Sequence, residues 1–214
     1  MKGSSHLTLG IAAGVGIGLY TQAEPVTIGV FAVVGGVAGL FPDLDTNGLA
    51  SNKITLSKSL IKMPLMIMGI CVMLYSLFES FMAMKIDFQI WGGILIGGVM
   101  ILLSSVITQK RMLSFTGVGI ILGGIAVDMS YWIILVGIYI VIASFLPHRS
   151  YTHSIIGLVF FSVILYMAQE ALNLEGLFIV GMVGYISHLI ADMKWLPMNR
   201  RGVRLFAPIW NREF

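Results

Sequence analysis

The segment QIWGGILIGGVMILLSSVI, residues 89–107, contains no charged side chain. Its length matches the roughly 20 apolar residues with which an α-helix crosses the hydrocarbon core of a bilayer. The rest of the chain has a similar composition, since 57% of its 214 residues are hydrophobic and 11% are charged. A soluble domain carries roughly 25% charged residues. The sequence therefore predicts an integral membrane protein.

Apolar runs of this kind recur along the whole chain. They lie at about residues 7–22, 27–41, 63–82, 89–107, 113–127, 130–146, 154–171 and 176–191. Several are shorter than the roughly 17–25 residues of a spanning helix, but a helix can extend by a turn into the interface. We predict an all-α fold, a polytopic transmembrane helical bundle of about eight membrane segments that forms a single domain over residues 1–214. The stretch 113–146 can form one long bent helix or two short helices divided near Asp128.

Glycine is abundant in these runs, with 25 residues in the chain and pairs at Gly35-Gly36, Gly92-Gly93, Gly97-Gly98 and Gly123-Gly124. Small residues let helix backbones approach closely in lipid. The glycines lack the strand-to-helix context and the lysine-serine ending of a nucleotide-binding loop. The single cysteine, Cys71, excludes an intrachain disulfide and a cysteine zinc site.

The cations lie almost entirely on one side of an eight-span topology. With the N-terminus on side one, this side holds twelve of the thirteen lysines and arginines, and side two holds Lys85 alone. The positive-inside rule makes side one cytoplasmic, so we expect both termini in the cytoplasm. Merging 113–146 into one span would place Arg149 and the C-terminal cations outside.

The same topology gathers the histidines and several aspartates at this face. Histidine and aspartate are usual protein ligands for divalent metals. The candidates are His6 at the start of the first run, Asp43 and Asp45 after the second, His148 and His153 between the sixth and seventh, and His188 and Asp192 at the end of the eighth. The count of cations used none of these residues, so the agreement is independent. Together they predict a site for one or two divalent metal ions.

Two of these elements also have an ordinary interpretation. His188 and Asp192 share one predicted helical face, where they can bind a metal together, Asp192 can orient His188, or the two can form a surface pair. Asp43 and Asp45 can form a simple polar turn after Pro42, which helps to end a helix. In an extended turn they would point to different sides, so one can bind a metal while the other bridges a second ion or holds a histidine. An acidic pair is unfavourable at a helix C-terminus unless a cation lies nearby.

The segment His148-Arg149-Ser150-Tyr151-Thr152-His153-Ser154 is the most specific element. Two histidines five residues apart do not share a helical face, so a loop that runs into the next helix is predicted. Arg149 is a planar double donor suited to phosphate or carboxylate oxygens. The alternative is an interfacial loop with basic and aromatic anchors. Ser150, Thr152 and Ser154 are better explained by caps and loop hydrogen bonds than as nucleophiles.

The two ends of the chain add weaker candidates. His6 precedes Gly10 by four residues, and this glycine leaves room for another element on the histidine's side of the helix. A stray interfacial histidine is the alternative. The C-terminal segment contains Arg200 and Arg204 among aromatic residues, where they can contact the charged part of a substrate or anchor the chain to anionic headgroups. Contact with anionic lipid headgroups accounts for this basic segment, so no nucleic-acid ligand is expected.

Together these elements resemble the YdjM-like family of bacterial inner-membrane proteins, which are described as metal-dependent hydrolases. The matching residues are His6 with Gly10, Pro42-Asp43-Leu44-Asp45, His148-Arg149 with Thr152-His153-Ser154, Ser187-His188 with Asp192, and Gly202-Val203-Arg204-Leu205-Phe206 before Pro208. Ser150 departs from the family pattern, which often has glycine there. The resemblance implies an inner-membrane location and hydrolysis, and it does not imply a substrate.

We therefore expect a metal-dependent hydrolase at the cytoplasmic face of the membrane. Zinc is the favoured ion, ahead of manganese and magnesium, and a zinc-bound water has a pKa of about 7. Arg149 is expected to stabilise developing negative charge, and Asp45 to act as general base if it is not a ligand. A site at this depth meets membrane lipids first, so the expected substrate is lipid-linked. A phosphoester is favoured, and acyl esters and amides stay open.

Two other classes of protein fit parts of the pattern. A transporter or metal-handling membrane protein without hydrolytic activity would place its site near the bilayer midplane, on interrupted helices. The candidates here lie at helix ends instead. A membrane scaffold would use the polar cluster for structure alone, and the metal content of the purified protein separates it from the other two classes.

Overall fold

Helices form all of the regular structure in the residues that the computed structural model describes, which are 2–46, 48–53, 56–84, 87–195, 199, 201–210 and 212–214. This confirms the all-α prediction. Each predicted apolar run forms one helix: α1 (Gly3–Tyr20), α2 (Pro25–Leu40), α4 (Ser59–Ala83), α5 (Phe88–Val106), α6 (Gln109–Ala126), α7 (Tyr131–Phe145), α8 (Ile155–Leu172) and α9 (Leu177–Ala191). The shorter elements are the 3-10 helices η1 (Phe41–Asp45) and η2 (Tyr151–His153), and the helix α3 (Leu49–Lys53).

The stretch 113–146 forms two helices, α6 and α7, rather than one. Asp128 adopts a left-handed conformation with φ of 50° directly after α6. The N–H of Met129 donates to the Gly124 carbonyl at 2.8 Å and that of Asp128 to the Ile125 carbonyl at 3.4 Å. These two bonds are the Schellman pattern that ends a helix, and aspartate tolerates the left-handed position better than most residues.

Four of the helical segments are long and apolar enough to cross a membrane: Pro25–Asp45, Ser59–Ala83, Phe88–Val106 and Ile155–Leu172. Tyr131–Phe145 and Leu177–Ala191 are shorter apolar helices. By length and composition, therefore, the described residues include four candidate spans, and the predicted number of about eight is not confirmed.

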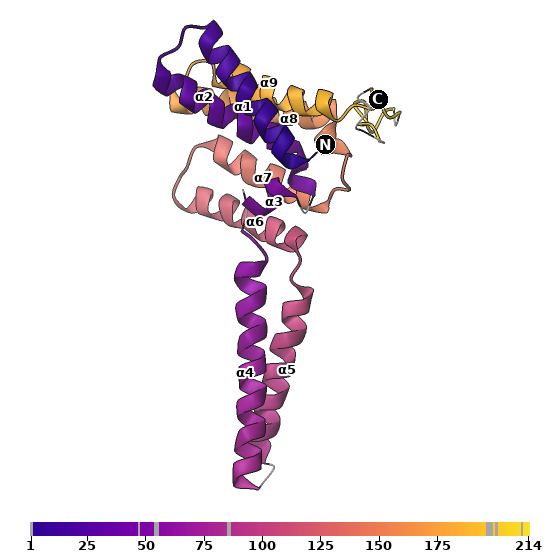
Figure 1. Cartoon of the computed structure of the whole chain (residues 1–214). Coiled ribbons are helices and arrows are strands. Elements are labelled where there is room, and N and C mark those ends of the chain that lie inside the picture. Colours follow the sequence, from indigo (N-terminus) through magenta and orange to yellow (C-terminus); the bar gives the residue numbers. More distant parts are fainter. Residues whose placement is uncertain are drawn as a thin grey trace.

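The helices form a bundle and a separate hairpin (Figure 1). In the bundle, α9 packs on α1, α2 and α8, while α7 lies between α8 and α6. The hairpin consists of α4 and α5, which pack along each other and project away from the bundle. Only 11% of the apolar stretch of α4 and 17% of that of α5 is buried inside the protein, against 44% for the candidate span that contains α2. The hairpin therefore presents apolar side chains on nearly all sides.

Gln109 holds the base of this hairpin. It is the first residue of α6, and its side chain is buried. Its Nε2 donates to the carbonyls of Ser51 at 2.6 Å and Leu56 at 3.1 Å, and its Oε1 accepts from the N–H of Lys58 at 2.9 Å. One amide side chain thus ties together the segment before α4 and the segment after α5.

Glycines allow α1, α2 and α9 to approach at backbone distance. A Cβ added at Gly10 would lie 2.2 Å from the Gly35 carbonyl oxygen, and one added at Gly184 would lie 2.6 Å from the same atom. Only hydrogen fits at these positions. The predicted role of glycine in close helix packing is therefore confirmed here, whereas Gly29 and Gly98 have open space beside them. This packing brings the first turn of α1 against the last turn of α9.

Candidate metal centre

Five helix ends meet at one end of the bundle, and all seven predicted ligand residues lie there. His6 belongs to the first turns of α1, His188 to the last turn of α9, and Asp192 caps α9. Asp43 and Asp45 lie in η1 after α2, and His148 and His153 lie in the segment between α7 and α8. The side chains of His6, Asp45, His153, His188 and Asp192 are all at most 2% exposed. The topology therefore brings together residues separated by up to 186 positions in sequence.

The Asp43–Asp45 segment is a 3-10 helix, not the extended turn that the sequence suggested. Pro42 lies in its first turn, where the missing N–H of proline costs nothing. A 3-10 helix has three residues per turn, so residues two apart point in different directions. Asp43 accordingly faces His153 and His188, whereas Asp45 faces His148 and Thr152.

His153 and His188 form the centre of the cluster, with their Nε2 atoms 3.1 Å apart. The Nδ1 of His188 lies 2.7 Å from the Gly39 carbonyl, which can only accept, so this nitrogen carries the hydrogen. The Nδ1 of His153 lies 3.0 Å from the Thr152 hydroxyl, which itself donates to Asp45 Oδ2 at 2.7 Å. His153 therefore donates from Nδ1 as well. Both Nε2 lone pairs then face each other, which is unfavourable unless a proton or a metal ion lies between them.

Two carboxylates lie beside these lone pairs. Asp43 Oδ1 is 3.5 Å from His153 Nε2 and 3.8 Å from His188 Nε2. Asp192 Oδ2 is 3.9 Å from each of the same two nitrogen atoms. Burial raises the pKa of the Asp192 carboxyl, whereas contacts that include those with His6 and His188 lower it, and the pKa lies well below its usual range. Asp192 is therefore an anion at neutral pH.

His6 is buried in this cluster without a well-aligned hydrogen bond. Its ring stacks on that of His188 with centroids 3.8 Å apart, and its Nε2 lies 3.3 Å from Asp192 Oδ1. Neither ring nitrogen of His6 makes a hydrogen bond of good geometry with any residue that the structure describes. Buried polar atoms are nearly always satisfied, so an orphaned imidazole nitrogen beside two carboxylates suits a metal ligand.

Asp45 stands behind the cluster rather than in it. Its Oδ1 lies 3.0 Å from His148 Nδ1, and its Oδ2 accepts the Thr152 hydrogen bond. Both oxygens are thus engaged in a fully buried side chain. Of the roles considered from the sequence, this placement favours holding histidines over acting as ligand or general base. Thr152 is the residue whose role in this site the sequence did not indicate, because nothing in its local pattern distinguishes a buried link from an ordinary loop hydrogen bond.

Arg149 connects the cluster to the C-terminal segment. Its Nη2 lies 3.4 Å from Asp192 Oδ2, and its Nη1 donates to the Arg201 carbonyl. The backbone at Arg149 is left-handed, with φ of 61°. The Nε atom is buried and has no partner among the described residues. The guanidinium therefore borders the histidine–aspartate cluster and keeps its Nε donor for a further group.

A cavity of about 360 Å³ opens beside the cluster. We call it the arginine pocket; its lining residues are Pro147, His148, Arg149, Ser150, Arg201, Gly202, Arg204 and Glu213. Two of these residues form an ion pair, with Arg204 Nη2 3.8 Å from Glu213 Oε1. The predicted substrate contact Arg204 thus lies near the cluster, whereas Arg200 lies outside the described residues. Arg201 lines the pocket although the sequence did not single it out among neighbouring arginines.

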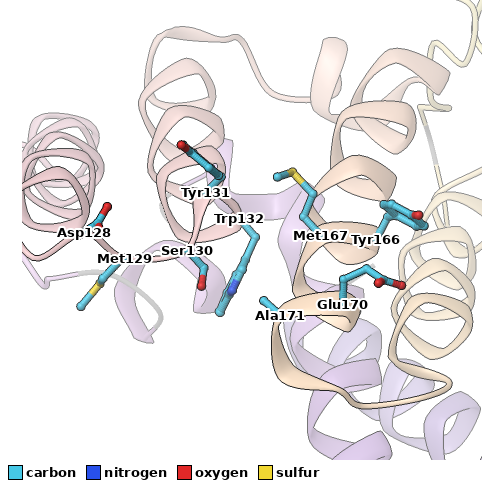
Figure 2. Close-up of a pocket in the computed structure, with 9 residues that line it drawn as sticks. All are labelled: Asp128, Met129, Ser130, Tyr131, Trp132, Tyr166, Met167, Glu170 and Ala171. Atoms are coloured by element: carbon cyan, nitrogen blue, oxygen red, sulfur yellow. The ribbon is translucent and has the colours of Figure 1, made fainter.

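A second cavity, of about 640 Å³, lies elsewhere. It is bounded by the segment before α7 and by the last turns of α8, at the opposite end of these helices from the cluster. Figure 2 shows Tyr131 and Glu170 on separate helices with their ends pointing in opposite directions. Its lining contains two carboxylates, Asp128 and Glu170, and neither belongs to a group of described residues that could hold a metal ion.

The donor set fits a divalent metal. Three overlapping groups of three residues could each hold a metal ion, because one ligand atom from each residue lies within 4.8 Å of the other two atoms of its group. The groups are His6, Asp43 and His188; Asp43, His148 and His153; and His153, His188 and Asp192. Two nitrogens bound to one tetrahedral zinc ion lie about 3.3 Å apart, close to the spacing of the two Nε2 atoms. Neutral imidazoles with carboxylates are usual ligands for zinc and manganese.

Fold and site together define a helical membrane protein with a buried histidine–aspartate cluster that can hold a metal ion. A family model described as YdjM inner membrane protein matches residues 1–214. The chain therefore belongs to this family, as its motifs indicated, and it is an inner membrane protein. No curated protein and no solved structure matched the chain.

Proposed function

We propose that this protein is a metal-dependent hydrolase whose site lies at the cytoplasmic face of the membrane and acts on a lipid-linked phosphoester. The observation that carries the proposal is the facing pair of Nε2 lone pairs on His153 and His188, 3.1 Å apart beside two carboxylates. A cation between them relieves their repulsion. An arginine pocket directly beside such a centre suits an anionic substrate.

The chain offers positions for one or two ions, with zinc favoured and manganese or magnesium as alternatives. His6, His188 and Asp43 form the more deeply buried group, and Asp43, His148 and His153 form the group nearer the arginine pocket. Asp43 belongs to both groups and would be a ligand in either. A bound divalent ion supplies a water with a lowered pKa and polarises the scissile group.

The surrounding residues orient the ligands and the substrate. Thr152 and the Gly39 carbonyl hold the Nδ1–H groups of His153 and His188, which leaves each Nε2 free to bind a metal. Asp45 holds His148 in the same manner. Arg149 is placed to contact an anionic oxygen of the substrate and to stabilise charge that develops there.

Metal analysis of the purified full-length protein tests this proposal first, followed by turnover assays on lipid phosphates such as phosphatidic acid. We expect bound zinc or manganese, and release of inorganic phosphate that stops when the metal is removed and resumes when it is restored. A folded protein that neither retains nor accepts a divalent metal would overturn the proposal. A metal-loaded protein that cleaves no ester would support the metal-handling alternative.

We further propose eight membrane crossings with both termini in the cytoplasm. The meeting of the ends of α1, α2, α7, α8 and α9 at one end of the bundle supports this topology, together with the distribution of cations. In Figure 1 the hairpin lies across the direction of α6 and α7, so eight parallel crossings require it to turn about its links to the bundle. Reporter fusions after residue 214 and near Lys85 should give opposite signals, and equal signals would exclude this topology.

A further inference from the structure

Two apolar grooves are lined by residues that directly follow, in the chain, those of the arginine pocket. The first groove, about 100 Å³, lies between α7 and α8, and its lining includes Ile142 of α7 and Ile156 of α8. The second, about 230 Å³, lies between the start of α8 and the C-terminal segment around Phe206 and Trp210. Ile156 lines both grooves, so they form one apolar strip around the start of α8.

Two chain segments run from the lining of the arginine pocket into the lining of this strip. Pro147 to Ser150 line the pocket, and the next two residues, Tyr151 and Thr152, line the first groove. In the C-terminal segment, Arg204 lines the pocket and Leu205 lines the second groove. The N–H of Ile155 donates to the Leu205 carbonyl at 2.9 Å, which fixes this segment against α8. A molecule with a charged end and an apolar end can therefore occupy pocket and strip together.

The strip opens on the surface that a bilayer would cover. Ile142 is 47% exposed and Ile156 49% exposed, and α8 is one of the candidate membrane spans. An apolar chain can then enter sideways from the lipid without passing through water. Because Thr152 lines the groove and contacts both Asp45 and His153, the apolar chain of such a molecule would lie next to the histidine–aspartate cluster.

The net charge of the arginine pocket indicates which charged headgroup fits it. Three guanidinium groups and the Glu213 carboxylate give the lining a net charge of +2 when His148 is neutral. Two donors in it, Arg149 Nε and Ser150 Oγ, are buried without a partner among the described residues. A phosphate monoester carries about −1.5 to −2 at pH 7, whereas a phosphodiester carries a single negative charge. The monoester is the better match.

We propose that the substrate is a lipid phosphomonoester, with its terminal phosphate in the arginine pocket and its apolar chain in the strip around Ile156. This inference rests on the proposed function and names the substrate class of the same site. A phosphodiester lipid and a water-soluble phosphate are the competing ligands.

Binding of non-hydrolysable phosphonates to the full-length, metal-loaded protein in detergent tests the inference. The probes are the dihexanoyl phosphonate analogue of phosphatidic acid, its mono-methyl ester, and 3,4-dihydroxybutylphosphonate, which lacks the acyl chains. We expect the first to bind most tightly. Arg204→Gln should weaken it roughly 10- to 100-fold, as expected for a lost hydrogen bond to a charged group. Arg212→Gln, outside the pocket, is the control.

The groove is tested by Ile156→Trp, which should fill it and weaken the acylated probe on the order of tenfold, with no effect on the probe that lacks chains. Val159→Trp is the matched control, since Val159 is 56% exposed on the same helix and lines neither groove. Equal effects of the two tryptophans, or equal binding of the methyl ester, would overturn the inference. Selective binding without any turnover would keep a lipid phosphomonoester as the ligand of this site and would reject the hydrolase. Turnover that Ile156→Trp does not change would keep the hydrolase and would reject the apolar strip as the binding site.

Discussion

The α4–α5 hairpin and the helices that carry the histidine–aspartate cluster are similar in composition and different in what they bury. Both hairpin helices are long and apolar enough to cross a bilayer, whereas of the five helices at the cluster only α2 and α8 lie in such segments. The hairpin buries little and leaves side chains such as Leu74 and Phe78 about 60% exposed. The bundle buries His6, His153 and His188 almost completely.

The hydropathy of a helix therefore does not show whether that helix carries part of the candidate site. Ionisable groups inside an apolar bundle are costly, and the ligand residues here lie at or near helix ends. Two helices of the cluster, α7 and α9, are not candidate spans because each has only 15 residues. The segment Pro25–Asp45 is nevertheless a candidate span although it contains Asp43 and Asp45. A substitution should therefore have very different effects in the two regions.

The largest expected difference is in metal binding. His153→Ala combined with His188→Ala removes both central nitrogens, and we expect complete loss of bound metal. Leu74→Ala combined with Phe78→Ala in the hairpin is the control and should keep full occupancy. Elemental analysis measures the metal, and circular dichroism checks that both variants remain helical. Full occupancy in the folded histidine variant would place the metal elsewhere.

Arg149 comes next, with an effect on turnover. Arg149→Lys keeps the charge but cannot contact Asp192 and the Arg201 carbonyl together, since it lacks the planar fork. Both Arg149→Lys and Arg149→Ala should lower the rate on the order of 100- to 1,000-fold while metal is retained. Arg212→Lys is the control. Near-normal turnover would remove Arg149 from catalysis, and loss of metal in both variants would make it a structural link.

Thr152→Val tests the support behind the ligands. It removes the hydroxyl that donates to Asp45 and accepts from His153, so His153 is no longer held with its Nε2 toward the cluster. Loss of such a supporting partner typically lowers metal affinity about 10- to 100-fold. The matched control is Thr116→Val, because Thr116 hydrogen-bonds within α6 near the hairpin. Competition with a metal chelator measures the affinity, and equal values for the two variants would contradict the assigned role.

The smallest expected effect concerns helix packing. Gly35→Ala would place a Cβ 2.3 Å from the Gly10 carbonyl oxygen, which forces α1 and α2 apart and should cost about 1–3 kcal/mol of stability. Gly29→Ala on the same helix meets nothing within 4 Å and should be neutral or slightly stabilising. Thermal unfolding in detergent compares the two. If Gly35→Ala is no less stable than Gly29→Ala, the close contact does not hold the bundle together.

The sequence by itself determined the helices and the residue types of the cluster. Short connections favour antiparallel neighbours, which brings His6 to the same end as Asp43 and His153 to the same end as His188. The link from α5 to α6 is an exception, because the hairpin lies across α6 (Figure 1), so the meeting of the two pairs depends on the tertiary structure. The division of 113–146 into two helices also has a local cause, since Asp128 adopts the left-handed conformation that ends α6.

Only the tertiary structure decided the individual roles. The separation of Asp43, in the cluster, from Asp45, behind it, depends on the 3-10 conformation of η1. The stacking of His6 on His188 depends on the glycine contacts of α1 and α9 with α2. Helix rotation and side-chain direction are set by contacts between segments distant in sequence. The separation of the hairpin from the bundle likewise left no mark in the apolar pattern, because lipid and a helix interface are equally apolar surroundings.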